Sequence, residues 1–394
     1  MNIKKILALV LAGALATAAF TACKSSDDSD VPSYSQSLSK NGLFKDGKKE
    51  LKAEEYIDLA DYSNMQIAKS DVELTEEELE DTLKDAISSY TTTEDVPRDE
   101  AAAEGDTLNI DYVGSVDGIE FVNGSTNGQG TTLVIGSGAF LQAGDMTDEN
   151  GHITHYKGFE EQLVGHKAGE SFDIDVMFPE GYSSSTDADG NEVILGGKAA
   201  VFHITINSVK RTTYPEITDE FVAENFADKY ESAEDMIAKI KANAEKTKLK
   251  NAVAAKLYRD SEVKEYPQVM TDYEKTYIRE YFTNLATKYG TTLEELISSI
   301  GDYDTVDEFI ESYKDDIEYT VKGYLICQAV VQKENIKAKD KDIKAYFVEN
   351  VGTEDYSSYE EQLGKPYLKL IVLMDKYLEA VVEKVELVYI LKKR

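Results

Sequence analysis

The sequence predicts an α+β protein in which one β-rich region lies between helical segments. Between Pro97 and about residue 211, glycine-punctuated stretches carry alternating apolar residues, which is typical of strands with one buried face. After Pro215 nearly every segment has apolar residues at helical spacing, and residues 75–90 are predicted as a capped helix. A β-rich region of this length can form its own core, so we expect it to be a separate folding unit.

The expected strands and helices follow these two periodicities in order along the chain. Strands are predicted at 107–116, 171–178 and 199–209, where apolar residues alternate with polar ones. Helices are predicted at 232–257, 268–290, 292–301, 305–334, 340–349, 357–363 and 365–388. Residues 41–70 show no clear pattern.

Composition and pattern divide the chain into five expected parts. A length of 394 residues is typical of two or three domains, preceded here by segments with other roles. The parts are a signal peptide at 1–22, a flexible tether at 23–50, an N-terminal linker with the 75–90 helix at 51–99, the β-rich domain at 100–211 and a helical domain at 212–394.

The first 23 residues have the pattern of an export signal. Two lysines precede an apolar run from Ile6 to Phe20, which is short for a membrane span of about 20 residues. Thr21 and Ala22 lead into Cys23, and this ending resembles a bacterial lipobox, in which the cysteine is lipidated and becomes the mature N-terminus. An ordinary signal peptide or an uncleaved anchor is the alternative. We expect Cys23 to hold the protein at the extracytoplasmic face of the cell membrane.

The charge excludes several classes of partner. The chain has 42 Lys+Arg against 75 Asp+Glu, a net charge of −33. Direct nucleic-acid binding is excluded, because the attraction to phosphate that supplies most of such affinity would be reversed. Anionic lipid is disfavoured for the same reason, so we expect membrane contact only through the lipid anchor.

The familiar catalytic and metal-binding patterns are absent from the sequence. His152 and His155 lie in a polar run without metal-ligand spacing and are predicted to be in a solvated loop. The stretch that begins at Asp187 lacks the closing glutamate of a calcium loop and is predicted to be a polar turn. Cys327 lies in an apolar helical stretch and is expected to be a buried structural thiol. No cofactor and no metal are predicted.

Phrases of the β-rich region resemble a known family. The phrases are GDTLNIDYVGSVDGIEF, GFEEQLVGHKAGESFDIDVMFPEGY and GGKAAVFHITINSV, in this order. They resemble the FKBP-type peptidyl-prolyl isomerase domain, in the version found in trigger factor. The segments YPEITDEFV and EYPQVMTDYE extend the resemblance to roughly residues 72–388. It implies an FKBP-like antiparallel β-sheet wrapped on a short helix, flanked by an all-α trigger-factor-like chaperone domain.

The resemblance implies a pocket that needs neither acid nor metal. An X–Pro bond isomerises over a barrier of about 20 kcal/mol because amide resonance must be broken. An apolar pocket that binds the twisted amide better than either planar form lowers this barrier. The matching positions are Tyr112 and Phe121 on early strands, Phe159 on the pocket floor, Tyr182 and Phe202 on later walls, and Leu141, whose backbone N–H would meet a substrate carbonyl. Taken singly, each aromatic residue could equally be part of a core.

Three departures from the family pattern bear on activity. Thr131 stands where the family usually has an aromatic residue, and Val122 where it has an acidic one. Residues 142–157 interrupt the short stretch between Leu141 and Phe159. This insertion could be a surface loop, a lid, or a segment that displaces Leu141 and prevents its contact with the amide.

The expected function is that of a membrane-tethered foldase. It would isomerise X–Pro bonds in unfolded or nascent exported polypeptides and bind these chains on helical arms. Ribosome binding is not expected, because the segment before residue 71 is short, the charge is acidic and the protein is exported. One alternative is a chaperone with an inactive pocket, and another is an adhesion or scaffold lipoprotein that reuses the fold. The clients and the oligomeric state stay open.

Overall fold

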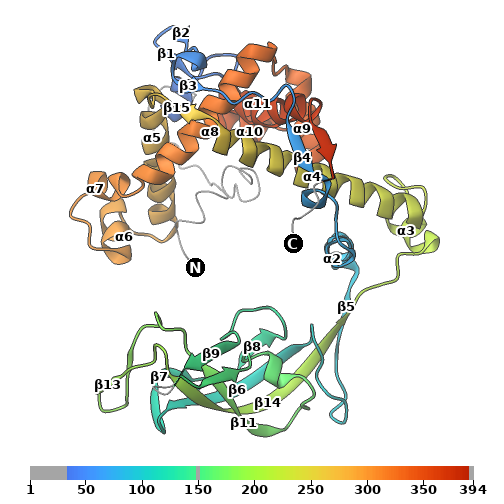
Figure 1. The fold of residues 1–394 in the computed structure, drawn as a ribbon, viewed down its shortest axis with the longest axis vertical. Coiled ribbons are helices and arrows are strands. Elements are labelled where there is room, and N and C mark those ends of the chain that lie inside the picture. Colours follow the sequence, from blue (N-terminus) through green and yellow to red (C-terminus); the bar gives the residue numbers. More distant parts are fainter. Residues whose placement is uncertain (1–32, 148–150, 390–394) are drawn as a thin grey trace. The chain divides into compact units, whose positions relative to one another are not determined.

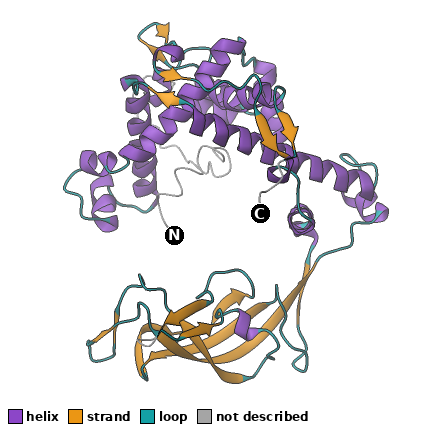
Figure 2. Cartoon of the chain, in the orientation of Figure 1, coloured by secondary structure: helices purple, strands orange, loops and turns teal. Residues whose placement is uncertain are grey.

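The computed structural model describes residues 33–147 and 151–389 and consists of two compact units (Figure 1). The sheet unit comprises Glu76–Ile240, and the helical unit joins the described residues before Glu76 to those from Lys241 onward. The predicted signal peptide and Cys23 lie outside the described residues. The two units are built on different secondary structure, as the sequence predicts (Figure 2).

An antiparallel sheet organises the sheet unit. Its strands follow the order β11-β14-β6-β7, with β5 also paired to β14 and β8 to β6. The bounds are β5 (Thr92–Asp95), β6 (Thr107–Val116), β7 (Ile119–Ser125), β8 (Thr131–Val134), β11 (Ser171–Met177) and β14 (Ala199–Thr213). The long β14 pairs with three other strands, so it is the centre of the unit.

Alternation along β14 and its neighbours builds the core of this unit. Ile204 and Ile206 on β14 are fully buried, as are Leu108 and Ile110 on β6. These positions are two residues apart, so their side chains point to the same face of the sheet. The strands predicted at 107–116, 171–178 and 199–209 are therefore confirmed, with β14 continuing to Thr213.

Short elements precede the strands of the sheet or lie between them in the sequence. They are the 3-10 turns η4 (Ser88–Tyr90) and η5 (Glu161–Leu163), the hairpin of β9 (Gly144–Thr147) with β10 (Ile153–Tyr156), and the pair β12 (Ser185–Thr186) and β13 (Glu192–Val193). His155 thus lies on a strand and not in the predicted loop. Its ring nitrogen Nδ1 lies 2.7 Å from a carboxylate oxygen of Asp145 on the paired strand. Among the residues that the structure describes, no group of three His, Cys, Asp or Glu side chains could hold a metal ion.

The sheet unit extends beyond the predicted 100–211 boundaries. α2 (Glu76–Ala86), α3 (Asp219–Asn225) and the first turns of α4 (Ala233–Asp260) belong to it. A separate small core holds them together, with Ile87, Val222 and Met236 buried at its centre. The linker and domain ends were misplaced because this core is built from residues that are far apart in the sequence.

Helices make up most of the other unit. They are the later part of α4, α5 (Gln268–Lys288), α6 (Leu293–Ile300), α7 (Val306–Glu311), α8 (Lys314–Glu334), α9 (Asp340–Val351), α10 (Ser357–Leu363) and α11 (Lys365–Val382). α8 is the most buried, and Val321, Leu325 and Val330 on it are inaccessible. Cys327 is also buried, and burial raises the pKa of its thiol, as expected of a structural cysteine.

Two predicted helices end differently from expectation. The predicted 305–334 helix is divided into α7 and α8 where the Ser312 hydroxyl donates to the Phe309 carbonyl oxygen, which competes with helix continuation. The ring of Tyr313 is buried at this break, 5.2 Å from that of Phe309. The predicted 365–388 helix ends at Val382 and is followed by β16 (Glu386–Val388), which pairs in parallel with β4 (Gln66–Ala68).

The N-terminal segment packs into the core of the helical unit. It contains η1 (Ser33–Ser37), η2 (Ala53–Glu55) and η3 (Lys69–Asp71), the pair β1 (Lys45–Asp46) and β2 (Lys49–Glu50), and β3 (Ile57–Asp58), which pairs with β15 (Glu262–Val263). Phe44 is fully buried, and the Gln328 side chain accepts from its N–H and donates to the Leu51 carbonyl oxygen at 2.7 Å. The prediction of a tether up to residue 50 therefore fails from Leu38 onward. The apolar residues here are too widely spaced to form a periodic signal.

Candidate functional site

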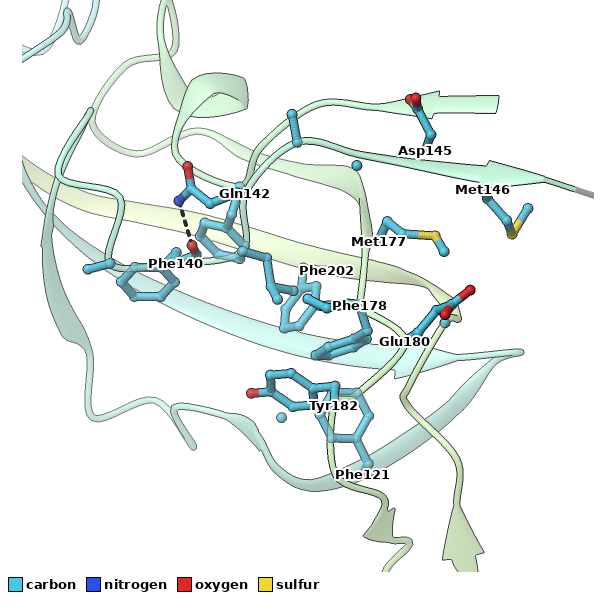
Figure 3. Close-up of a pocket in the computed structure, with 18 of the residues that line it drawn as sticks. Phe121, Phe140, Gln142, Asp145, Met146, Met177, Phe178, Glu180, Tyr182 and Phe202 are labelled. Atoms are coloured by element: carbon cyan, nitrogen blue, oxygen red, sulfur yellow. Dashed lines mark hydrogen bonds between the residues drawn. The ribbon is translucent and has the colours of Figure 1, made fainter. Parts of the chain in front are cut away.

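A cavity of about 750 Å³ lies in the sheet unit (Figure 3). All six residues that the sequence singles out for the pocket line it: Tyr112, Phe121, Leu141, Phe159, Tyr182 and Phe202. Tyr112, Phe121 and Phe202 come from β6, β7 and β14. Leu141 lies between β8 and β9, Phe159 between β10 and η5, and Tyr182 after β11. Residues separated by up to 90 positions therefore converge on one space, and five of the six also belong to or pack against the core of the sheet unit.

Phe202 is the centre of an aromatic cluster. Its ring centroid lies 5.7 Å from that of Tyr112, 5.5 Å from that of Phe159 and 6.3 Å from that of Phe121, with steep interplanar angles. Such edge-to-face arrangements are the favoured geometry of aromatic pairs. Phe159 is 1% exposed and forms the floor of the cavity, whereas Tyr182 is 49% exposed at its rim.

Two glycines allow the aromatic rings to lie against the sheet. Gly114 is the β6 partner of Phe202, and a Cβ atom there would lie 2.4 Å from the phenyl ring. A Cβ at Gly124 would lie 2.7 Å from the ring of Phe121. Only glycine lets a side chain approach the backbone this closely, so the glycines of this region position the cavity walls.

Two further aromatic residues that sequence reasoning missed complete the lining. Phe140 stacks on Phe159 at 4.9 Å, and Phe178 lies 4.6 Å from Tyr182 and 5.9 Å from Phe121. Phe178 opens the FPEGY segment of the second phrase that carries the resemblance, and Phe140 lies outside the three phrases but directly precedes Leu141. The sequence signal that could have identified both residues was their position close to predicted site residues.

The cavity stays uncharged at its aromatic end. Burial, together with the nearby Tyr182 phenol, raises the pKa of Tyr112, so its hydroxyl stays protonated. The only ionisable carboxylates among the described lining residues are Asp145 and Glu180. The described lining contains no His, Cys, Ser or Lys side chain that could act as a nucleophile or proton shuttle. The site is therefore suited to binding and conformational change.

A buried carboxylate holds the loop at 137–141 that carries Leu141. Glu160 is 5% exposed and accepts hydrogen bonds from the N–H groups of Gly138, Ala139 and Phe140 at 2.9–3.1 Å, and from the Ser137 hydroxyl at 3.0 Å. Burial alone would raise the pKa of Glu160, but the donations from these groups lower it below its ordinary value. The ionised side chain thus fixes the loop next to the cavity floor.

Leu141 lies at the cavity wall, at the base of the insertion. Its carbonyl oxygen accepts from the Phe159 N–H at 2.7 Å, so the chain leaves at residue 142 and returns at Gly158 to the same point. Among the residues that the structure describes, the Leu141 N–H donates to no acceptor. The insertion therefore leaves Leu141 next to Phe159 and within the cavity lining.

The other two departures lie outside the cavity lining. Thr131 is half-buried on β8, opposite Ile110 on β6. Val122 is 48% exposed on β7. Neither replaces a lining side chain.

Comparison with known proteins gives two family matches and a set of relatives. Residues 98–207 match the family described as FKBP-type peptidyl-prolyl cis-trans isomerase, and residues 226–383 match the bacterial trigger factor C-terminus. Proteins called trigger factor are 30% identical over 316 residues in Limosilactobacillus fermentum, 30% over 345 residues in Staphylococcus saprophyticus and 31% over 318 residues in Enterococcus faecalis. These alignments cover 78%, 84% and 78% of this chain, and 66%, 72% and 67% of the relatives.

The chain thus spans roughly two thirds of the length of these relatives. A solved structure of a trigger factor chaperone aligns over 83% of this chain and 72% of that one, at 16% identity and a TM-score of 0.29. That likeness is too weak to bear on the fold.

Replacing Glu160 by Gln is expected to loosen the loop at 137–141. The amide cannot accept all the bonds that the carboxylate accepts, which costs about 1.5–3 kcal/mol. Hydrogen exchange of the amides of residues 138–140, measured by mass spectrometry at pH 7, should become at least about tenfold faster. The pKa of Glu160 is lower in the folded protein than in the unfolded chain. The stabilisation that its carboxylate gives is therefore fully present above the unfolded-state pKa and is lost as the pH falls through the folded-state pKa. The difference between the two proteins should therefore shrink in acid.

Glu161→Gln is the matched control for this prediction. Its side chain is 55% exposed, and its carboxylate lies 3.6 Å from the ammonium group of Lys157 and makes no hydrogen bond to residues 137–141, so exchange of the loop should not change. Equal exchange in the Glu160→Gln and Glu161→Gln proteins would contradict the role given to Glu160.

Proposed function

The chain belongs to the trigger factor family and its sheet unit is an FKBP-type peptidyl-prolyl cis-trans isomerase domain, and on this premise we propose that the protein is a membrane-tethered foldase of exported polypeptides. It isomerises X–Pro bonds in the cavity of the sheet unit and binds non-native chains on the helical unit. The observation that carries the proposal is the convergence of six sequence-predicted residues on one cavity.

The geometry accounts for catalysis without a reacting side chain. Tyr112, Phe159 and Phe202 offer a neutral, water-poor surface on which a proline ring packs, and the exposed Tyr182 closes one side. The Leu141 N–H donates to the carbonyl oxygen of a substrate. Rotation about the X–Pro bond breaks amide resonance, so a site that binds the twisted, less polar amide better than the planar ones lowers a barrier of about 20 kcal/mol.

An active isomerase is favoured over a chaperone with an inactive pocket. The 142–157 insertion would have supported the second possibility had it filled the cavity. Residues 142–147 of the insertion line the cavity instead, and the Leu141 carbonyl oxygen accepts from the Phe159 N–H. Membership of a chaperone family likewise favours a foldase over an adhesion or scaffold protein.

The helical unit offers apolar groups for transient contact with clients. Tyr289 is 70% exposed, Tyr319 52% and Val348 47%. Scattered exposed apolar side chains give weak contacts that many different chains can make and leave. Such contacts suit binding of unfolded or nascent polypeptides.

The proposed location rests on the sequence of residues 1–23. That segment has the pattern of an export signal with a lipidated Cys23. In residues 33–147 and 151–389, no helix has the length and hydropathy needed to span a membrane. The prediction that this protein does not bind ribosomes has no support from its family. It depends only on the export signal and on the charge of −33.

Removing two cavity walls tests the isomerase proposal. The Tyr182→Ala, Phe202→Ala double variant should lower kcat/KM for an X–Pro peptide at least about tenfold. A tenfold loss corresponds to about 1.4 kcal/mol of binding to the twisted amide, and the two aromatic rings together should contribute at least this much. Exchange spectroscopy by NMR measures the rate on a peptide that populates both isomers.

The Phe172→Ala variant is the control for loss of an aromatic residue. Phe172 stacks on His166 outside the cavity at a centroid distance of 3.5 Å, so activity should persist. No rate enhancement by the unmodified protein would leave only the chaperone function. Equal enhancement by the double variant would contradict the proposal that catalysis takes place in this cavity.

Replacing Cys23 by Ala tests the tether. The unmodified protein should incorporate labelled fatty acid, sediment with membranes and be cleaved by protease added to spheroplasts. The Cys23→Ala protein should lose the label because it lacks the thiol that carries the lipid. Sucrose-gradient analysis of the same lysate separates membranes from ribosomes.

Two outcomes would contradict this location. One is unchanged labelling and membrane sedimentation of the Cys23→Ala protein. The other is migration of the unmodified protein with ribosomes and its protection from added protease.

A further inference from the structure

The peptide group between Phe140 and Leu141 carries the amide donor of the proposed mechanism. Its N–H belongs to Leu141 and its carbonyl oxygen to Phe140. The described residues contain no cis peptide bond, so this group is trans and its N–H and C=O point in opposite directions. A contact that holds the Phe140 carbonyl oxygen therefore also sets the direction of the Leu141 N–H.

The peptide groups on either side are held by other bonds. The Phe140 N–H donates to the Glu160 carboxylate at 3.1 Å, and the Leu141 carbonyl oxygen accepts from the Phe159 N–H at 2.7 Å. These atoms belong to the preceding and the following peptide groups. Neither bond involves the N–H or the C=O of the Phe140–Leu141 peptide group, so neither fixes the rotation of its plane.

Gln142, the first residue of the insertion, supplies this contact. Its side-chain Nε2 donates to the Phe140 carbonyl oxygen at 2.8 Å (Figure 3). No backbone N–H in the described part of the chain donates to the same oxygen. The side chain folds back over the loop at 137–141, where a Cβ atom at Gly138 would lie 3.7 Å from Nε2. A single side chain thus sets the plane of the Phe140–Leu141 peptide group.

We propose that Gln142 is a positioning residue for X–Pro isomerisation, which holds the Leu141 N–H in the direction that meets the carbonyl oxygen of a client. The inference rests on the proposed isomerase function and deepens it, because it names the group that orients the amide donor. Leu141 lines the cavity, and its N–H has no acceptor among the described residues, so this donor is available to a client.

The same bond makes the amide a stronger donor. A hydrogen bond to a peptide oxygen polarises the whole group, which strengthens the bond that its N–H can make. A donor that is oriented before the client binds needs no reorganisation while the X–Pro bond twists. Because Gln142 is exposed, its bond competes with water, and we expect it to contribute about fivefold to the rate.

One NMR signal follows this peptide group in the full-length protein. Phe is followed by Leu only at residues 140 and 141. Labelling of Phe with carbonyl ¹³C and of Leu with ¹⁵N therefore gives a single HNCO cross-peak, which reports the Phe140 carbonyl and the Leu141 N–H together. Gln142→Leu, which has a similar size but no donor, should move the ¹³C resonance upfield. An added X–Pro peptide should move the Leu141 proton downfield, and less so in the variant.

Kinetics separate positioning from packing. Gln142→Leu should lower kcat/KM for the X–Pro peptide about fivefold, mostly through kcat, because the aromatic walls that bind the proline ring are untouched. Gln142→Lys, whose ammonium group can donate to the same carbonyl oxygen, should recover most of the lost activity. Gln129→Leu is the matched control, because Gln129 is exposed and does not line the cavity, and it should leave both the rate and the cross-peak unchanged.

The outcomes separate this inference from the function on which it rests. Absence of isomerisation by the unmodified protein would overturn the proposed function and the role of Gln142 with it. Isomerisation that Gln142→Leu does not slow, or that Gln142→Lys does not recover, would overturn the inference alone. A loss confined to KM with an unchanged cross-peak would also overturn it, because Gln142 would then only pack against the cavity wall.

Discussion

The site depends on one buried carboxylate that accepts hydrogen bonds from successive backbone N–H groups. Glu160 follows Phe159 directly, so the group that fixes the loop at 137–141 is covalently attached to the floor of the cavity. The loop ends at Leu141, whose carbonyl oxygen accepts from the Phe159 N–H. Floor and amide donor are thereby held at a fixed separation. A charge buried in this way is tolerated only because all its bonds are made within the loop.

This constraint explains why the chain accommodates an insertion next to the floor. The residues before and after it are joined by the Phe159 N–H bond to the Leu141 carbonyl oxygen, so Leu141 and Phe159 stay adjacent and the added residues 142–147 extend the cavity wall. Long insertions cost little free energy when their ends are already close together. The insertion, which in the sequence suggested an inactive pocket, thus supplies residues of the cavity lining.

The sequence predicted the parts of the structure that depend on local interactions, and it did not predict those that depend on distant ones. The bounds of β6 were predicted correctly because its alternation is continuous. Five of the six predicted site residues stand in phrases that resemble the family, and the sixth, Leu141, lies between two of these phrases. The hairpin was missed because each of its strands has only four residues and none of them is fully buried, so the alternation is too short to be read from the sequence. The packing of residues 38–72 was missed because its partners, such as Gln328, are more than 250 positions away.

The most direct test of the account is a crystal structure of the full-length protein with a proline-containing peptide. The account predicts the proline ring packed among Tyr112, Phe159 and Phe202, with a peptide carbonyl oxygen within hydrogen-bond distance of the Leu141 nitrogen. A peptide bound outside the cavity, or a proline ring in the cavity with the Leu141 N–H directed away from the peptide, would contradict it.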